Sequence, residues 1–200
     1  MSRRSWGRAA ARMAAAALAW AAVLAGPVSA LTLRLDGNAV WRNQNDAKIR
    51  QTYGSGVAVT AGFDLVFRSG WEAGLRFESA ASRAGMLGLS ASAAEFGLWG
   101  LDATIGREIR LGAAGFYARG GIGLYHYKQT VDYAYVQDHR VNRFAPAGVI
   151  AVGIRFYPWR FLFLSADAKY VVLPVKPYGQ AVDLGGIRLG GGLGFIFGRR

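Results

Sequence analysis

The chain has 200 residues, with 24 Lys and Arg against 12 Asp and Glu, and therefore carries a formal net charge of +12. It contains no cysteine, which excludes disulfide frameworks and thiolate metal sites. Its 28 glycines are far above average usage of about 7%, and they follow no collagen-like period.

Residues 1–30 predict a cleaved secretory signal peptide. The first 12 residues hold four arginines and no acid, an apolar run of 14 residues covers 13–26, and Pro27 precedes small residues ending at Ala30. An uncleaved membrane anchor is the alternative, but a spanning helix needs roughly 20 apolar residues. Because only cations leave with the signal peptide, the remaining domain, residues 31–200, carries a net charge of +8.

Alternating apolar and polar residues predict eight β-strands in this domain, most of them about ten residues long. In one of them Val57, Val59 and Phe63 fall on one face, while Thr60 and Asp64 fall on the other. In another, the alternation shifts phase near Gly100, where we expect a β-bulge. The predicted strands are residues 31–42, 56–67, 71–78, 94–105, 114–127, 144–157, 161–172 and 184–197.

The connections between these strands alternate between short and long. Short turns are expected at residues 68–70, 106–112 and 158–160. The longer polar loops are residues 43–55, 79–93, 128–143 and 173–183. Short turns at one end and long loops at the other are typical of outer-membrane barrels, with the turns and both termini in the periplasm.

The two classes of closed barrel orient their apolar faces oppositely. A soluble lipocalin-like barrel turns the apolar face inward, whereas a membrane barrel turns it outward. The second face here is rich in glycine and carries balanced charges, which favours a narrow, charge-paired lumen. The charges assigned to the lumen are Arg34, Asp36, Asp64, Glu72, Arg76, Glu78, Asp102, Arg119, Arg155, Asp167, Lys169 and Arg188.

Aromatic residues gather near both ends of the predicted strands. Such rings form interfacial girdles on either side of a lipid-facing apolar band. Ordinary β-propensity of aromatic residues is the alternative explanation. The residues assigned to the girdles are Phe67, Trp71, Tyr157, Trp159 and Phe197 at the turn end, and Trp41, Tyr127, Phe144 and Tyr170 at the loop end.

The last predicted strand ends with Gly192, Phe195 and Phe197, a glycine followed by alternating aromatics. With its eight strands, the chain resembles the small eight-stranded outer-membrane proteins, which include the OmpA transmembrane domain, OmpX-type barrels and OmpW-like proteins. The resemblance implies an all-β, antiparallel up-and-down transmembrane barrel after an N-terminal signal peptide. It also implies that Gly192, Phe195 and Phe197 form an assembly signal for the barrel-insertion machinery. Members commonly end on the aromatic residue, whereas three residues follow it here.

Few residues indicate a catalytic or metal-binding function. His126 and His139 are the two histidines, and no HExxH, CxxC, GxxxxGK or GxSxG motif occurs. The lipid A deacylase type is similar in size, but it has a histidine two residues before its catalytic serine, whereas Tyr127 and Lys128 follow His126. We predict no catalytic residue, no cofactor and no metal site.

The expected function is structural, in envelope integrity or surface interaction, for a monomer whose lumen is plugged by paired charges. Three alternatives stay open. They are a lipid A-modifying outer-membrane enzyme, such as a lipid A oxidase-like protein, a narrow porin for small or hydrophobic solutes, and a soluble periplasmic barrel binding an apolar ligand. Inner-face residues Val66, Val149 and Ile196 would leave room for a hydrophobic path.

The expected partners are outer-membrane lipid, lipopolysaccharide and the barrel-assembly machinery, and not nucleic acid. Cations in the long loops would meet lipopolysaccharide phosphates at the outer rim. The alternative is that these loop cations are only solvated by water and bind no ligand. These cations are Lys48, Arg50, Arg83, Lys128, Arg140, Arg143 and Lys176.

Overall fold

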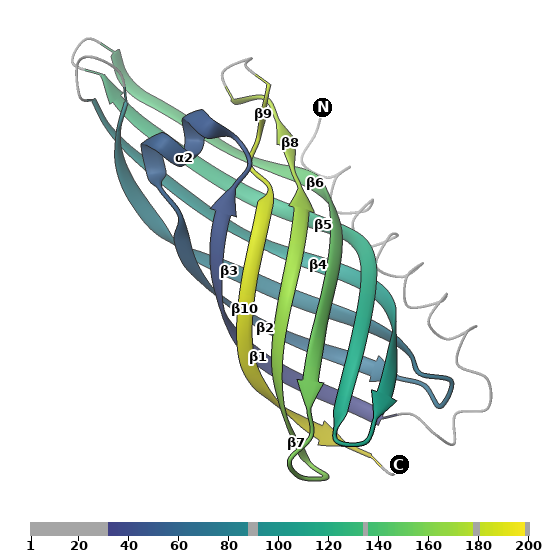
Figure 1. The fold of residues 1–200 in the computed structure, drawn as a ribbon. Helices are drawn as coiled ribbons and strands as arrows, with labels where there is room; N and C mark the ends of the chain where they lie inside the picture. Colours follow the sequence, from purple (N-terminus) through teal and green to yellow (C-terminus); the bar gives the residue numbers. More distant parts are fainter. Residues whose placement is uncertain (1–31, 88–91, 134–135, 178–180, 199–200) are drawn as a thin grey trace.

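The computed structural model is a closed antiparallel β-barrel of eight strands, in the order β1-β10-β7-β6-β5-β4-β3-β2 (Figure 1). The structure describes residues 32–87, 92–133, 136–177 and 181–198. The predicted signal peptide lies outside these residues. The barrel strands are β1 (Thr32–Gln44), β2 (Gly56–Val66), β3 (Trp71–Leu87), β4 (Ser92–Leu111), β5 (Ala114–Tyr133), β6 (Val136–Phe156), β7 (Leu162–Val172) and β10 (Gly186–Phe197).

Consecutive strands pair with one another and β1 closes on β10, which confirms the predicted eight-stranded up-and-down architecture. Four strands are much longer than predicted. β3 to β6 have 17 to 21 residues, whereas a tilted strand crosses a bilayer in about 9–11. In β3, β5 and β6 the extra length lies at the loop end, where strands continue past the helix α2 (Figure 1), whereas β4 is extended mainly at the turn end. α2 spans Ala47–Tyr53.

Two predictions about β4 are wrong. Residues 106–111 continue the strand and pair with β5 as far as Leu111 opposite Ala114, so the turn at this end is short. No bulge lies at Gly100, because the pairing of β4 with β3 is regular there and its register shift falls between Ala80 and Arg83. The phase shifts in the sequence pattern because Phe96 and Leu98, which are apolar, face the lumen and are buried there.

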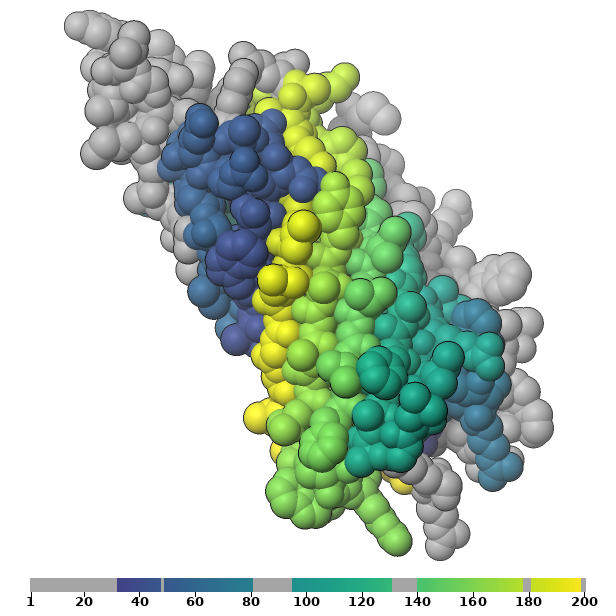
Figure 2. All heavy atoms as spheres, in the orientation of Figure 1, coloured from purple at the N-terminus to yellow at the C-terminus, as the bar shows by residue number. Residues whose placement is uncertain are grey.

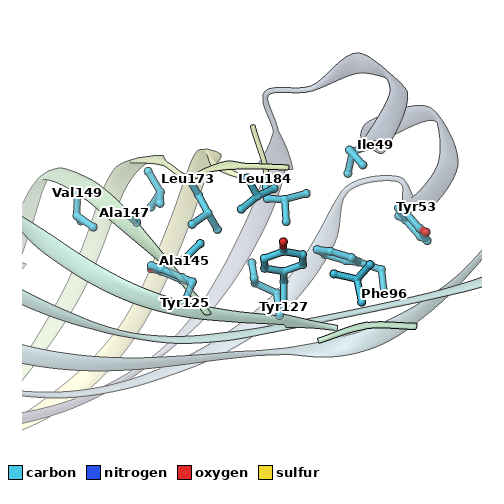
Figure 3. Close-up of a cluster of buried hydrophobic side chains, with 14 residues drawn as sticks. Ile49, Tyr53, Phe96, Tyr125, Tyr127, Ala145, Ala147, Val149, Leu173 and Leu184 are labelled. Atoms are coloured by element: carbon cyan, nitrogen blue, oxygen red, sulfur yellow. The ribbon is translucent and has the colours of Figure 1, made fainter. Parts of the chain in front are cut away.

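The loop end of the barrel is filled by an apolar cluster, which we call the loop-end cluster (Figure 3). α2 contributes Ile49 and Tyr53, and the Tyr53 ring lies 5.2 Å from the Phe96 ring. Asp46 accepts a hydrogen bond from the Ile49 amide and so caps the start of α2. The members are Ile49, Tyr53, Phe96, Leu98, Tyr125, Tyr127, Val141, Ala145, Ala147, Val149, Val171, Leu173, Val175 and Leu184.

A short strand pair above the barrel wall extends this end. β8 (Pro174–Val175) pairs with β9 (Val182–Asp183). Asp183 accepts hydrogen bonds from the Asn45 side chain and from the backbone amides of Leu173 and Gly185, at 2.8–2.9 Å. Burial raises the pKa of Asp183, but these three hydrogen bonds outweigh it and hold the pKa below its ordinary value. The connection after β7 is thereby tied to the segment after β1.

The outer wall is apolar all round the barrel. Val57, Val59, Ile109, Leu111 and Ile150 are each more than 60% exposed, and every barrel strand contributes exposed apolar side chains. In Figure 2 the bands of β10, β7 and β6 form a continuous wall on the visible face, with α2 beside the loop end of β10. No helix among the described residues is long and apolar enough to span a membrane.

Most of the aromatic residues assigned to the girdles lie on the outside of the barrel, but the assignment is wrong for two. Trp41, Phe144 and Tyr170 are exposed on the outer wall at the loop end, as are Trp71, Trp159 and Phe197 at the turn end. Tyr127 and Tyr157 are instead buried, at 3% and 8% exposure. Tyr127 belongs to the loop-end cluster, and Tyr157 reaches the charges described below.

Candidate functional site

The lumen near the turn end holds a buried network of charges, which we call the turn-end network. Arg155 Nη1 donates to Glu72 and to Glu108, each at 2.6 Å, and Arg155 Nη2 donates to Asp64 at 3.0 Å. Arg34 donates to the same two glutamates, at 3.1 and 2.7 Å. Two guanidinium groups therefore hold three carboxylates that come from three other strands.

Glu108 has the most partners in this network. Besides Arg34 and Arg155, it accepts hydrogen bonds from Tyr157 at 2.8 Å and from Arg110 at 2.6 Å. The Arg110 guanidinium also lies over the Tyr157 ring, 3.8 Å from its centroid. Since Glu108 is 6% exposed, these contacts close the lumen at the turn end.

A second group of charges lies midway along the lumen. Arg76 donates to Asp36 at 2.6 Å, and Arg119 forms a salt bridge with Asp167 at 3.5 Å. Tyr117 OH donates to Asp167 at 3.2 Å, and its ring lies under the Arg155 guanidinium. Longer salt bridges from Arg76 and Arg119 to Asp64 join this group to the turn-end network.

A third group, the upper network, lies beneath the loop-end cluster. Glu78 accepts hydrogen bonds from Lys169, at 2.6 Å, and from Arg188, and it forms a salt bridge with Arg42 at 3.6 Å. Lys169 also donates to Asp102 at 3.0 Å, and Tyr125 OH donates to Asp102 at 3.0 Å. Arg188 donates to the same Tyr125 oxygen at 2.9 Å.

The structure places every charge assigned to the lumen inside the barrel, and each one forms a salt bridge there. Arg42 and Glu108 were missed, although both continue the alternation of their strands. Tyr117 and Tyr125 were also missed as partners of the charges. The Tyr125 ring lies across Gly100, where a Cβ would overlap it, so a side chain at this position would displace the ring.

The predicted assembly-signal residues lie on β10. Phe195 and Phe197 are 45% and 50% exposed on the outer wall. Gly192 faces the lumen and pairs with Asn38 of β1 and Ser165 of β7. Their positions leave the two rings accessible from outside the barrel.

One pocket opens at the loop end, where β2 begins and the pairing between β2 and β3 stops. This wall pocket encloses a cavity volume of about 10 Å³, which is room for about one water molecule. Gln44 lines it, is 7% exposed, and its Oε1 atom has no hydrogen-bond partner among the described residues. The lining residues are Arg42, Gln44, Gly54, Gly56, Val57, Ala80, Phe96 and Leu98.

Fold and lumen together define a small, closed, eight-stranded barrel of the type found among outer-membrane proteins. No protein-family model matches the chain, and no curated protein matches it in sequence. Within the part of the chain that the structure describes, no group of three His, Cys, Asp or Glu side chains could hold a metal ion.

Solved structures share the fold at low sequence identity. The outer-membrane protein OprG from Pseudomonas aeruginosa has a TM-score of 0.62 at 11% identity, covering 86% of this chain and 98% of OprG. A major outer-membrane protein of Thermus thermophilus has a TM-score of 0.56 at 10% identity, covering 84% and 100%. The attachment invasion locus protein Ail of Yersinia pestis, solved with a heparin analogue, has a TM-score of 0.52 at 15% identity, covering 84% and 97%.

Proposed function

We propose that this chain is a bacterial outer-membrane protein, exported by its signal peptide, whose closed barrel has a non-enzymatic role in envelope structure or surface interaction. The barrel spans the membrane as a monomer, inserted by the assembly machinery that reads Gly192, Phe195 and Phe197. Its surroundings are outer-membrane lipid and lipopolysaccharide.

The observation that carries this proposal is the inverted distribution of polarity. Side chains such as Val59, Leu111 and Ile150 are more than 60% exposed on the outer wall, while Arg34, Arg155 and Arg188 are at most 2% exposed inside. In water this arrangement would expose apolar surface and bury charge, and both are unfavourable. In a bilayer the same wall is solvated by lipid, and the closed barrel leaves no unpaired strand edge.

The pairing of the lumen charges supports a plug in place of a conducting pore or an acid–base site. Each lumen carboxylate is already held by at least one guanidinium or ammonium group. An eight-stranded barrel has an interior that side chains alone can fill. Paired charges from opposite walls therefore act as cross-links through the lumen.

Membrane fractionation combined with a heat-modifiability gel tests this proposal. We expect the full chain, expressed in a Gram-negative host, in the outer-membrane fraction, with a different mobility before and after boiling because a closed barrel resists detergent. Release into the soluble fraction by carbonate would contradict the proposal and favour the soluble, ligand-binding barrel.

The wall pocket favours a second candidate function, passage of small hydrophobic solutes. Phe96 and Leu98 line the pocket together with Arg42 and Gln44, and they also belong to the loop-end cluster, so the pocket adjoins the apolar part of the lumen. If this is a path, Ala80→Trp would fill it and lower cellular uptake of a radiolabelled apolar solute such as naphthalene several-fold. Ala61→Trp, on the exposed face of β2, is the matched control. Uptake by Ala80→Trp equal to that of the control would reject the path.

A further inference from the structure

An aromatic cluster lies on the outer wall at the loop end of β4, β5 and β6. Trp99 pairs with His126, and His126 pairs with Phe144, so the three side chains are neighbours across three strands. The Trp99 and His126 rings stack with centroids 5.0 Å apart, and the Phe144 ring meets both edge-on. Trp99 and Phe144 are 39% and 52% exposed.

Two cations lie on the same wall, further toward the loop end. Lys128 and Arg140 are both exposed. Their neighbours in sequence, Gln129 and Val141, point the other way, because Gln129 donates to Tyr53 OH and Val141 belongs to the loop-end cluster. Since side chains alternate along a strand, Lys128 and Arg140 project from the outer face.

The surroundings of these cations leave room for a ligand. Lys128 lies between Gly97, which has no side chain, and Asn142, whose Oδ1 atom is 2.5 Å from His126 Nε2. Arg140 pairs with Thr130, and Glu95 pairs with Thr130 from the other side. Among the side chains that the structure describes, this face has two cations, Lys128 and Arg140, and one carboxylate, Glu95, beside an exposed aromatic cluster.

The described outer wall at the loop end of β1, β10 and β7 presents a different set of side chains. They are Trp41, Asn43, Ile187 and Tyr170, of which Asn43 pairs with Ile187 and Ile187 with Tyr170. None of these four carries a charge, so Lys128 and Arg140 distinguish the wall of β5 and β6 from the wall of these three strands.

We propose that this outer face of β4 to β6 binds the phosphorylated glucosamine headgroup of lipid A in the outer leaflet. Interfacial aromatic rings mark the boundary between acyl chains and headgroups. Lys128 and Arg140, just beyond the rings, can then donate charge-assisted hydrogen bonds to phosphate. Trp99 and Phe144 contact the sugar and the first carbons of the acyl chains. The proposal rests on the proposed function, since it requires the barrel to span the outer membrane with its loops outside.

The test measures which lipids stay bound to the full chain. The protein is folded into phosphatidylcholine nanodiscs containing bisphosphorylated lipid A, dephosphorylated lipid A or phosphatidylglycerol, then transferred to detergent, and co-purifying lipid is quantified by mass spectrometry. We compare wild type, Lys128→Gln/Arg140→Gln, and the matched double variant Arg107→Gln/Arg160→Gln, which removes two exposed cations at the turn end. Each sample is first checked for heat-modifiability.

Wild type is expected to retain bisphosphorylated lipid A at least tenfold more than either other lipid. The variant Lys128→Gln/Arg140→Gln is expected to retain at least tenfold less bisphosphorylated lipid A than wild type, because a hydrogen bond to a charged group contributes about that factor. The control double variant is expected to retain an amount of bisphosphorylated lipid A within about twofold of the wild-type amount. Equal retention by Lys128→Gln/Arg140→Gln and wild type, an equal loss in the control, or equal retention of phosphatidylglycerol would overturn the proposal. Failure of wild type to insert would instead reject the proposed membrane barrel.

Discussion

Arg155→Met is expected to lower the free energy of unfolding by about 3–5 kcal/mol. Arg155 is 1% exposed and donates to Asp64, Glu72 and Glu108. Methionine fills much of the space but leaves those three buried carboxylates with fewer cations, and unpaired buried charge is costly. Equilibrium unfolding in guanidinium chloride, in phosphatidylcholine liposomes, measures the effect as a shift in midpoint at unchanged slope.

The matched control is Arg107→Met. Arg107 is exposed on the outer face of β4 near the same turn end, and we expect its substitution to leave the midpoint unchanged. A midpoint for Arg155→Met equal to that of this control would mean that the turn-end network contributes nothing to stability. A changed slope would instead indicate altered compactness or loss of two-state unfolding.

Much of the lumen could be predicted from the sequence because its geometry is simple. Side chains alternate strictly along a strand, so once Arg34 is inside, Asp36 is inside as well. Which charges contact one another could not be predicted, because the partners are far apart in sequence. Arg155 and Asp64 are 91 residues apart, and Arg34 and Glu108 are 74 apart.

Glu108 was missed because it lies within residues 106–112, which were predicted to form a turn. Gly106 and Gly112 bracket it, and such residues commonly mark the ends of strands. In the structure Gly106 lies within β4, where a Cβ would overlap the Ala118 carbonyl oxygen and lie 2.5 Å from the Arg119 Cβ. This glycine allows close strand approach, so the alternation continues through it to Glu108.

The change of polarity along the lumen also could not be predicted from the sequence pattern. Near the turn end the inner face carries charges such as Glu72 and Arg155, but at the loop end it carries Phe96 and Tyr127. The alternation of side chains along a strand predicts which residues share a face. It does not predict that one face is polar at one end of the barrel and apolar at the other. Tyr127 was therefore assigned to the outside, although it shares a face with Arg119.

Glu78→Gln is expected to lower the free energy of unfolding by about 3–5 kcal/mol. Glu78 is 1% exposed and is the acid that Lys169, Arg188 and Arg42 share. Glutamine keeps the shape of the side chain but removes its charge, so the three cations lose the acid that they share, while Lys169 keeps its salt bridge with Asp102. Guanidinium unfolding in liposomes again gives the size of the effect, and Glu95→Gln, an exposed acid on the outer face, is the control expected to behave as wild type.

A double variant separates loss of charge balance from loss of shape. Lys169→Met removes one cation from the upper network, so Glu78→Gln/Lys169→Met restores the balance of charge that Glu78→Gln disturbs. We expect the double variant to be more stable than the sum of the two single effects predicts, by about 0.5–3 kcal/mol of coupling. Additive effects would show that the two side chains act independently and that the lumen charges are not a plug held by mutual pairing. Coupling of the expected sign would show that charge balance across the lumen stabilises the closed barrel.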